Sequence, residues 1–445
     1  MLQKNRSVCM FVWNMFTNDA RVLRECTALT EAGYRVSLIC LRGRNQPPLE
    51  NVKGFSIHRV KKEFPVVTHL FGLHRRLLRH KLLFLLLFLL AVAAFVGLWF
   101  VSRAFSIVFA ALYALFLISY ACKVPAAFNK LGAVLRMIYA GRRIHADIYH
   151  ANDLNTLPQA CFCARFGRRK KARLVYDSHE VQTSRTGYSK NVYYIERYLI
   201  RRADLIFCEN ETRADYMAKL YPAAAAPVPL YNYPNYYDCD ALEPQKIDLH
   251  SLLNIPREEP ILLYQGGIQY GRGLDKLVKA ASFFERGVVV FIGSGRFKPE
   301  LEEIIRKEGM QERIRLLPKV PLAELPRYTM NGYLGFQVLN NTCFNHYSAA
   351  SNKLFEYIMA GVPVVASRFP EFIKVIEESG AGLLVDSSDP ASIAEAVNRL
   401  TGDEALRESM SRACRKAAKQ YNWENHKDYF LHAYSEIGKG GEANG

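Results

Sequence analysis

The chain has 445 residues, of which 50% are hydrophobic and 23% are charged, and its net charge is +17 at pH 7. The length indicates two domains, and the composition excludes a disordered polypeptide. The basic residues crowd around one apolar segment and form no stripe interleaved with aromatic residues, so they favour a membrane surface over a nucleic acid as the partner.

The N-terminal part of the chain predicts the start of a doubly wound parallel sheet. An apolar run, "SVCMFVW" at 7–13, is followed by the polar loop "NMFTND" and by a stretch of helical spacing that ends at Gly33. A second apolar run, "VSLICL" at 36–41, completes a strand–helix–strand unit. Such a unit is typical of α/β proteins with helices on both faces of the sheet.

An apolar insert follows. The segment from Leu82 to Val101 contains no charged side chain, and a second apolar segment runs from Phe105 to Ala121. As a helix the first segment is about 30 Å long, the thickness of a hydrocarbon layer. The strands on either side belong to one sheet, so both ends must lie on the same side of a membrane. We therefore predict a membrane hairpin at 82–121 that spans the bilayer twice or dips into it; two helices buried in a soluble core are the alternative.

Three further strands are predicted after the insert, and each ends in polar residues. They are "ADIYHAND" at 146–153, "ARLVYDSHE" at 172–180 and "ADLIFCEN" at 203–210. Ligands of such sheets bind at the carboxyl ends of the strands. Asp153, His179 and Glu180 are therefore candidate functional residues.

A proline-rich stretch without periodicity then separates two domains. After it the alternation of strand and helix restarts. We predict an N-terminal domain at 1–232, a linker at 233–258, a second doubly wound domain at 259–420, and a final helix with a tail at 421–445.

The second domain carries two glycine-rich turns after strands. In "YQGGIQYGRGLDKL" at 264–277, Gly266 and Gly267 allow the backbone to approach a ligand closely, and Arg272 offers a fixed cation for phosphate. "IGSG" at 292–295, which ends in Gly295, is the second turn.

A helix that begins near Ser351 or Asn352 completes the predicted ligand site. Helix N-termini attract phosphate through free N–H groups and the helix dipole. Lys353 lies in the first turn, where a cation opposes the dipole, so we interpret it as a phosphate ligand. Glu356 lies one turn later, where it can accept hydrogen bonds from a ribose. These features together predict a nucleotide diphosphate as the ligand.

In this order, the glycine turns, "NKLFEYIMAGVPVVAS" at 352–367 and "SGAGLLVD" at 379–386 resemble the donor domain of the family 4 (group 1) glycosyltransferases of the GT-B fold. "HANDLNTLP" and "YDSHE" resemble the acceptor-side domain, and the tail resembles the helix that crosses back to it. The resemblance covers nearly the whole chain outside the insert. It implies an α/β protein with two Rossmann-like domains facing a cleft, and metal-independent transfer of a hexosyl group from a nucleotide sugar.

The resemblance assigns roles to individual residues. Arg272 matches the basic residue that clamps the donor diphosphate, and Glu356 matches the second glutamate of the E-x7-E motif, which holds the ribose. The first glutamate falls at Ser348, and an arginine usual in the family falls at Gly267. We infer that Lys353 supplies the missing charge. A similar lysine and an apolar segment occur in the mannosyltransferases that act on dolichol-diphosphate-chitobiose, which invert, whereas family 4 retains; the stereochemical outcome stays open.

The resemblance also separates a donor side from an acceptor side. The donor-binding set is Gly266, Gly267, Arg272, Gly295, Asn352, Lys353, Leu354 and Glu356. The acceptor-side set is Asn18, Asp19, Asp153 and His179, with Arg21 on the same first loop; Asp19 and Asp153 can also serve as helix caps. If the enzyme retains, the leaving diphosphate takes the acceptor proton and Asp153, His179 and Glu180 orient the sugar. If it inverts, one of these three is the general base.

We expect neither a metal nor a cofactor. "DCD" at 238–240 has the Asp-x-Asp pattern of a metal motif, but it lies in the proline-rich linker and not at a strand end. The ten cysteines show no metal-type spacing, so we interpret them as reduced thiols.

The predicted function is membrane-associated transfer of a sugar to a lipid-linked acceptor, either a polyprenyl-diphosphate glycan or a glycolipid. Both soluble domains would lie at the cytoplasmic face of a membrane such as the bacterial plasma membrane. Two alternatives stay open. One is a transferase with a small soluble acceptor. The other is a non-catalytic scaffold on a degenerate transferase fold, which the serine at position 348 would suggest.

Overall fold

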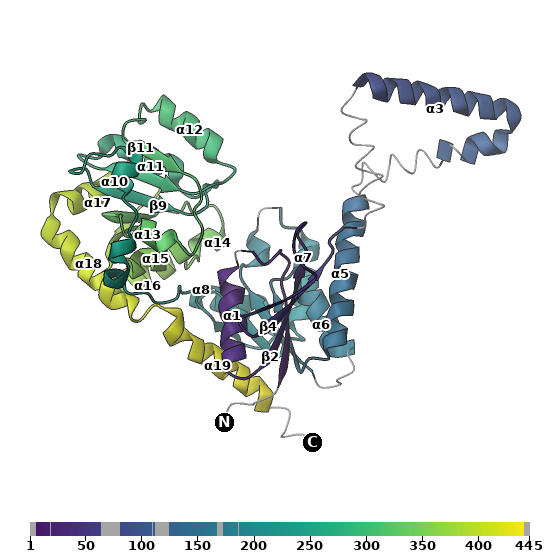
Figure 1. The fold of residues 1–445 in the computed structure, drawn as a ribbon, viewed down its shortest axis with the longest axis horizontal. Helices are drawn as coiled ribbons and strands as arrows, with labels where there is room; N and C mark the ends of the chain where they lie inside the picture. The colour runs from purple at the N-terminus through teal and green to yellow at the C-terminus, as the bar shows by residue number, and fades with distance from the viewer. Residues whose placement is uncertain are drawn as a thin grey trace. The chain divides into compact units, whose positions relative to one another are not determined.

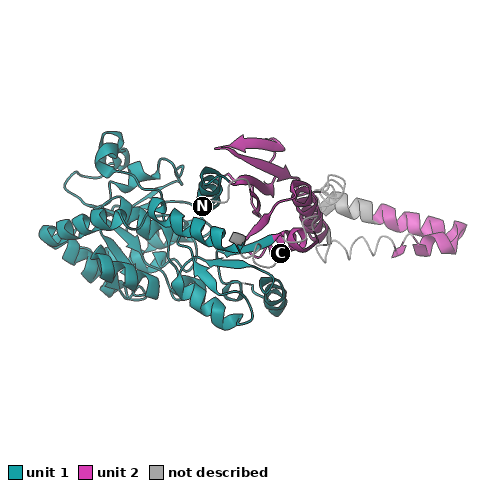
Figure 2. Cartoon of the chain, turned by 90° about the horizontal axis from the view of Figure 1, so that it is seen from below, with its two compact units in different colours: residues 1–4, 18–33, 173–445 teal, residues 5–17, 34–172 magenta. Residues whose placement is uncertain are grey.

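The computed structural model (Figure 1) describes residues 6–17, 19–63, 81–108, 110–111, 124–166, 172–185 and 187–439. By its internal contacts the chain divides into two compact units, shown in Figure 2. The small unit contains residues 5–17 and 34–172, and the large unit contains residues 1–4, 18–33 and 173–445. The predicted domain limits stay a prediction.

The small unit contains strands in the order β3-β4-β2-β1-β5, which are parallel except for the pair β3–β4. Its strands are β1 (Ser7–Phe11), β2 (Arg35–Leu41), β3 (Leu49–Val52), β4 (Phe55–Val60) and β5 (Ile148–Asn152). Its helices are α3 (Lys81–Val101), α5 (Val124–Ile144) and α6 (Leu157–Phe166). Because β1 pairs with both β2 and β5, the strands before and after the apolar insert belong to one sheet, as predicted.

The first half of the apolar insert is helical. Helix α3 covers the predicted segment 82–101, and the Ser106 hydroxyl donates a hydrogen bond to the Phe95 carbonyl oxygen at 3.3 Å, so the chain turns back beside α3. Residues 109 and 112–121 of the predicted hairpin lie outside the described residues. In the part that is described, no helix is both long and apolar enough to cross a bilayer. The structure therefore does not support the predicted spanning hairpin.

The large unit contains two sets of parallel strands. The first set has the order β6-β7-β8, and the second is a six-stranded sheet in the order β11-β10-β9-β12-β13-β14. The strands are β6 (Arg173–Ser178), β7 (Leu205–Cys208), β8 (Pro227–Pro229), β9 (Ile261–Gln265), β10 (Val288–Ile292), β11 (Ile314–Leu317), β12 (Leu334–Gln337), β13 (Val364–Ser367) and β14 (Gly382–Val385).

The large unit also contains helices, and many of them connect successive strands, as the predicted alternation requires. They are α1 (Ala20–Glu31), α7 (Lys190–Ile200), α8 (Glu211–Leu220), α9 (Cys239–Leu242), α10 (Leu249–Leu253), α11 (Leu274–Ala280), α12 (Lys298–Lys307), α13 (Leu325–Thr329), α14 (Phe344–Tyr347), α15 (Asn352–Met359), α16 (Pro370–Ser379), α17 (Pro390–Gly402), α18 (Glu404–Ala418) and α19 (Trp423–Lys439). Short 3₁₀ turns lie at Gln182–Ser184, Glu243–Gln245 and Ala281–Phe283.

The six-stranded sheet is buried on both faces. On β9, Leu263 joins the hydrophobic cluster on one face, while its neighbours Leu262 and Tyr264 join the cluster on the other. Successive side chains of a strand point to opposite faces, so a strand covered by helices on both sides must be apolar throughout. This burial fixes the sheet and leaves only its strand ends for a ligand. Every cysteine in the described part is free.

Helix α19 packs against elements from the first half of the large unit. The ring of Phe207 on β7 lies 5.5 Å from that of Phe430, and the Arg24 guanidinium on α1 lies 5.9 Å from the Trp423 ring. The backbone N–H of Tyr231 donates a hydrogen bond to Nε2 of His426 at 3.0 Å. This bond requires an unprotonated Nε2, and burial lowers the pKa of His426 to about 4.

The buried His426 should make the free energy of unfolding depend on pH. Its folded pKa lies below the unfolded value of about 6.5, so it contributes stability above that pH and loses it as the pH falls towards 4. We expect the wild type to lose about 2–3 kcal/mol more between pH 7 and pH 4 than His426→Gln, measured by urea unfolding. His432→Gln, on the exposed face of the same helix, should behave like the wild type. Equal losses in wild type and His426→Gln would contradict this role.

Candidate functional site

The large unit contains a cavity of about 1110 Å³ at the ends of its strands. Residues after β6 and β7 line one part of it, and residues after β9, β10, β11 and α14 line the rest. The lining residues are His179, Glu180, Ser184, Arg185, Glu209, Arg213, Gln265, Gly266, Gly267, Arg272, Ile292, Gly293, Ser294, Lys319, Val320, Pro321, Leu322, Leu325, Cys343, Asn345, His346, Ala349, Ser351, Asn352, Lys353 and Glu356.

Two glycine turns form one wall of the cavity by packing backbone against backbone. The N–H of Gly266 donates a hydrogen bond to the Ile292 carbonyl oxygen at 2.9 Å, and a Cβ atom on Gly293 would lie 1.9 Å from the Gly266 carbonyl oxygen. A Cβ on Gly295 would lie 1.9 Å from the Ile268 carbonyl oxygen. Gly293 lines the cavity, and the predicted Gly295 does not. A glycine is needed at 295 because any side chain there would clash with the other turn.

Helix α15 begins at the cavity. Its N-cap residue, Ser351, makes no side-chain capping bond, so no cap side chain satisfies the N–H groups of the first turn. Ser351, Asn352 and Lys353 all line the cavity. Leu354 lies on the other face of the helix and is fully buried in the hydrophobic core, so the structure does not place this predicted donor residue at the cavity.

Two cations, Lys353 and Arg272, lie close together near this helix end. Lys353 is 7% exposed, and its Nζ lies 4.0 Å from the centre of the Tyr264 ring. Burial, together with the nearby Arg272, lowers the pKa of Lys353 well below its ordinary value. Neither Lys353 nor Arg272 forms a hydrogen bond or an ion pair with any residue that the structure describes. The carboxylate of Glu356 favours the charged form of Lys353, but it faces two cations, so the arrangement favours an anionic ligand.

The carboxylate of Glu356 lies beside this pair and is held in place. Nε2 of Gln265 donates a hydrogen bond to Glu356 Oε2 at 2.6 Å, and the Thr329 hydroxyl donates to Oε1 of Gln265 at 2.8 Å. Burial raises the pKa of Glu356. Sequence reasoning missed Gln265, although its place as the last residue of β9, directly before the glycine turn, is a usable signal.

The acceptor-side candidate His179 is oriented by a buried ion pair. Asp177 is fully buried, and Arg21 donates to both of its oxygens, at 2.8 and 2.6 Å. Nε2 of His179 lies 2.9 Å from Asp177 Oδ2. Arg21 was expected on the first loop near the diphosphate; it lies instead in α1, where its guanidinium is used by Asp177, Glu25 and the Leu230 carbonyl oxygen.

The other acceptor-side candidates are scattered. Glu180 lines the cavity and forms an ion pair with Arg185 at 2.9 Å. Asp19 caps α1 by accepting a hydrogen bond from the N–H of Val22 and does not line the cavity. Asp153 belongs to the small unit and is not among the lining residues. Asn18 lies outside the described residues.

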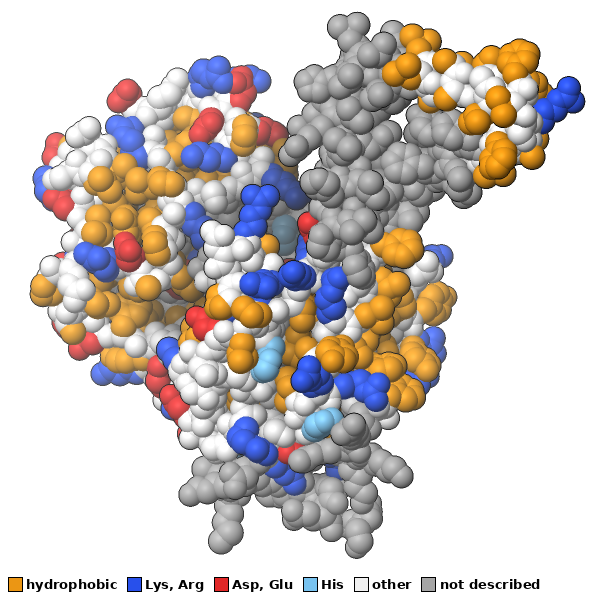
Figure 3. Space-filling view, turned by 45° about the vertical axis from the view of Figure 1, so that its right-hand side comes forward, with side chains coloured by type: hydrophobic (Ala, Val, Ile, Leu, Met, Phe, Trp, Pro, Cys, Tyr) orange, Lys and Arg blue, Asp and Glu red, His pale blue; other side chains and the backbone are white. Residues whose placement is uncertain are grey.

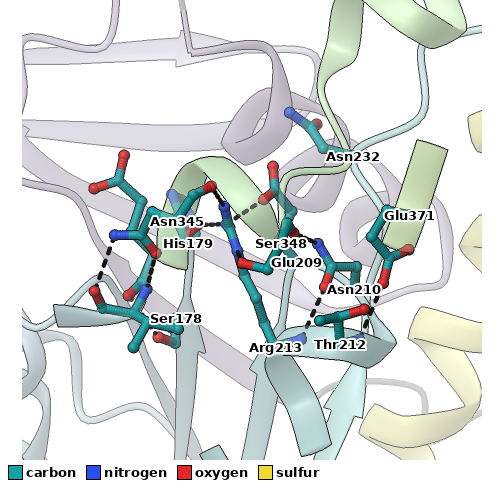
Figure 4. A network of polar contacts seen from close by, with 12 residues as sticks. Ser178, His179, Glu209, Asn210, Thr212, Arg213, Asn232, Asn345, Ser348 and Glu371 are labelled. Atoms are coloured by element: carbon teal, nitrogen blue, oxygen red, sulfur yellow. Dashed lines mark hydrogen bonds and ion pairs between the residues drawn. The ribbon is translucent and has the colours of Figure 1, made fainter. Parts of the chain in front are cut away.

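A buried arginine that sequence reasoning missed connects the two parts of the lining (Figure 4). Arg213 is 4% exposed; it donates to the His179 carbonyl oxygen at 2.7 Å, to the Asn345 carbonyl oxygen at 2.9 Å and to the Ser348 hydroxyl at 3.1 Å. It also forms an ion pair with Glu209, which lines the cavity. Glu209 lies four residues before Arg213, but Asn345 and Ser348 lie more than a hundred residues away, so no local pattern could have indicated this network.

The "DCD" segment has a structural role. Asp238 accepts a hydrogen bond from the N–H of Asp240 at the start of α9, and Asp240 forms an ion pair with Arg415 at 3.1 Å. Neither aspartate lines the cavity.

Comparison with known families matches both parts of the chain. Residues 245–417 match the family model of the glycosyl transferases group 1, and residues 19–232 match that of the glycosyl transferase 4-like domain. A D-inositol 3-phosphate glycosyltransferase of Xylanimonas cellulosilytica is 23% identical over 256 residues, which cover 55% of this chain and 60% of that protein. The chain thus matches less than two thirds of that relative's length.

Solved structures with the same fold cover almost the entire chain. The sucrose-phosphate synthase of Thermosynechococcus elongatus has a TM-score of 0.69 at 15% identity and covers 98% of this chain and 100% of its own. The Anabaena protein HepE, in complex with UDP-glucose, has a TM-score of 0.67 at 14% identity, with 97% and 99% covered. The predicted two-domain α/β GT-B fold is confirmed.

The lowered pKa of Lys353 should make diphosphate binding take up protons. A bound diphosphate raises the pKa of the lysine again. The affinity for the diphosphate should therefore fall as the pH rises from the pKa of the lysine in the free protein to its pKa in the complex. Calorimetric titration with UDP in two buffers of different ionisation enthalpy should show proton uptake in the wild type and none in Lys353→Met. Lys276→Met, an exposed lysine on α11 outside the cavity, is the matched control. Proton uptake in Lys353→Met equal to that of the wild type would contradict the assignment of Lys353 as a diphosphate ligand.

Proposed function

Because the chain belongs to the glycosyltransferases that join a 4-like domain to a group 1 domain, we propose that it transfers a hexosyl group from a nucleoside-diphosphate sugar to an acceptor hydroxyl. The observation that supports this most directly is the pair of neighbouring cations, Lys353 and Arg272, near the N-terminus of α15, neither of which forms an ion pair or a hydrogen bond with the described residues. The carboxylate of Glu356 beside them is suited to accept hydrogen bonds from the ribose.

The transfer breaks the bond between the sugar's C1 and the diphosphate oxygen and forms a bond between C1 and the acceptor oxygen. Negative charge grows on the leaving diphosphate, where Lys353 and Arg272 stabilise it. We propose that the enzyme retains the configuration at C1 and that the leaving diphosphate takes the acceptor proton. His179, held by Asp177, then orients the acceptor. The reaction so described uses no bound metal and no cofactor.

For the acceptor, we propose a lipid-linked sugar at a membrane surface. Large apolar side chains at the described end of the insert are exposed to solvent: Phe100 by 84%, Val101 by 82% and Phe105 by 69%. Hydrophobic side chains gather on the helical segment at the upper right of Figure 3. An apolar surface of this kind is typical of lipid contact, and Arg103, whose guanidinium lies 5.7 Å from the Trp99 ring, suits a headgroup layer. The two soluble units would then lie on the cytoplasmic face.

A small soluble acceptor is the second candidate. It is favoured by the name of the relative from Xylanimonas cellulosilytica, a D-inositol 3-phosphate glycosyltransferase. Inositol 3-phosphate is therefore a necessary probe beside lipid acceptors.

Removing either cation should weaken transfer strongly. We expect Arg272→Ala and Lys353→Ala each to lower kcat/KM, because each cation stabilises charge on the leaving group. The decrease should correspond to about 2–4 kcal/mol of lost transition-state stabilisation. The assay follows nucleoside diphosphate release from a panel of UDP-, ADP- and GDP-hexoses, in excess EDTA, with Lys276→Ala as control. Full activity in both variants would contradict the donor site, and activity that returns only with Mn²⁺ or Mg²⁺ would contradict metal independence.

The apolar insert should be needed for membrane binding and not for nucleotide binding. We expect the wild type to float with vesicles of phosphatidylglycerol and phosphatidylethanolamine, and a variant with a Gly/Ser linker in place of 82–121 to stay in the soluble fraction. The variant should still bind UDP, because Arg272, Lys353 and Glu356 lie in the large unit. Equal flotation of both proteins, or failure of the wild type to float, would contradict the membrane proposal.

A further inference from the structure

The first position of the E-x7-E motif, occupied here by Ser348, does not face the cavity. Ser348 is fully buried; its hydroxyl donates to the Phe344 carbonyl oxygen at 2.7 Å and accepts from Nε of Arg213 at 3.1 Å. It is absent from the residues that line the cavity. If the cavity contains an acidic group in place of the first glutamate of the motif, that group must come from another element.

Three carboxylates of the described chain line the cavity: Glu180, Glu209 and Glu356. Glu356 is held by Gln265 beside the two cations, and Glu180 is 45% exposed and paired with Arg185. The side chain of Glu209 is only 18% exposed. Among the described residues that line the cavity after β6 and β7, it is thus the less exposed of the two acidic groups.

Arg213 fixes the position of the Glu209 carboxylate. The guanidinium binds Oε2 of Glu209, while its other N–H groups are used by His179, Asn345 and Ser348 (Figure 4). The next residue, Asn210, caps α8 and donates to the Ser348 carbonyl oxygen at 2.7 Å. Oε1 of Glu209 receives no hydrogen bond from any residue that the structure describes. One carboxylate oxygen is therefore anchored and the other is available to a ligand.

A phosphate would be repelled by this carboxylate, whereas sugar hydroxyls donate hydrogen bonds to it. Hydrogen bonds to a charged acceptor are about twice as strong as neutral ones and depend on the direction of the hydroxyl. A site that bonds a particular hydroxyl rejects substrates that lack it or point it elsewhere.

We propose that Glu209, anchored by Arg213, binds the hydroxyl groups of the transferred hexosyl group and determines which epimer the enzyme accepts, in place of the carboxylate missing at position 348. This inference rests on the proposed function, because it assumes a nucleotide sugar whose diphosphate lies at Lys353 and Arg272. It assigns to Glu209 a contact with the sugar and not with the nucleotide.

The test compares Glu209→Gln with wild type and with Glu211→Gln. Glu211, two residues later in α8, is exposed and paired with Lys374 at 2.6 Å, so it is a matched control. The panel of UDP-, ADP- and GDP-hexoses identifies the donor. For Glu209→Gln we expect the donor KM to rise about tenfold and the ratio of kcat/KM between the donor and its epimers to fall about tenfold. Glu209→Asp, which keeps the charge, should give a donor KM and an epimer ratio between those of the wild type and those of Glu209→Gln.

Binding of the corresponding nucleoside diphosphate separates this inference from the function on which it rests. Its affinity should be unchanged in Glu209→Gln, which also shows that the variant is folded. An unchanged epimer ratio would overturn the inference and leave the proposed function intact. A lower kcat with an unchanged donor KM and a lost acid limb of the pH profile would also overturn it, since Glu209 would then act as a base. If the wild type binds no nucleotide, the proposed function fails and this inference fails with it.

Discussion

A buried lysine that forms no ion pair or hydrogen bond with the described residues, with a second cation beside it, organises the site of this protein. Removing such a group from water costs several kcal/mol unless a counter-charge compensates it. Lys353 is nevertheless nearly fully buried, against the ring of Tyr264, with Arg272 nearby. Its place in the first turn of α15 opposes the helix dipole as well. Stability alone does not explain this arrangement, whereas a diphosphate would satisfy the lysine, the arginine and the open N–H groups of the helix together.

The rest of the large unit positions this site. The apolar strands of the six-stranded sheet are covered on both faces, so only their carboxyl ends are available to a ligand. The glycine turns after β9 and β10 pack directly against each other and form one wall. On the opposite side, Arg213 connects the loop after β6 with the segment around Ser348. Side chains with many fixed partners hold the site in the absence of a ligand, as preorganised binding requires.

Local sequence patterns predicted the two-domain fold correctly, and they pointed to residues that the structure brings together at one cavity. The alternation of apolar strands and helices indicated both parallel arrangements, and the glycine turn with Arg272 and the first turn of α15 lie at one cavity. Each of these signals is contained in a short stretch of sequence. Leu354 was misplaced because the motif does not show which face of the helix points into the core. Gly295 was misplaced because its requirement comes from a backbone carbonyl of another turn.

The acceptor side could be predicted only in part. His179 and Glu180 were singled out because strand ends carry ligands, and both line the cavity. Arg21 acts on Asp177 and Arg213 on Ser348, partners 156 and 135 residues away, whereas Glu209 pairs with Arg213 four residues later. For the apolar insert, composition predicted a helix at 82–101, and the structure has one with exposed apolar side chains at its described end.

The account is tested most directly by an experimental structure of the protein with the nucleoside diphosphate of its donor. It predicts the diphosphate at the N-terminus of α15, with its oxygens within hydrogen-bond distance of Lys353 Nζ and of the Arg272 guanidinium, and the ribose hydroxyls on Glu356. A diphosphate bound elsewhere, with the Lys353 ammonium still without an anionic partner, would contradict it.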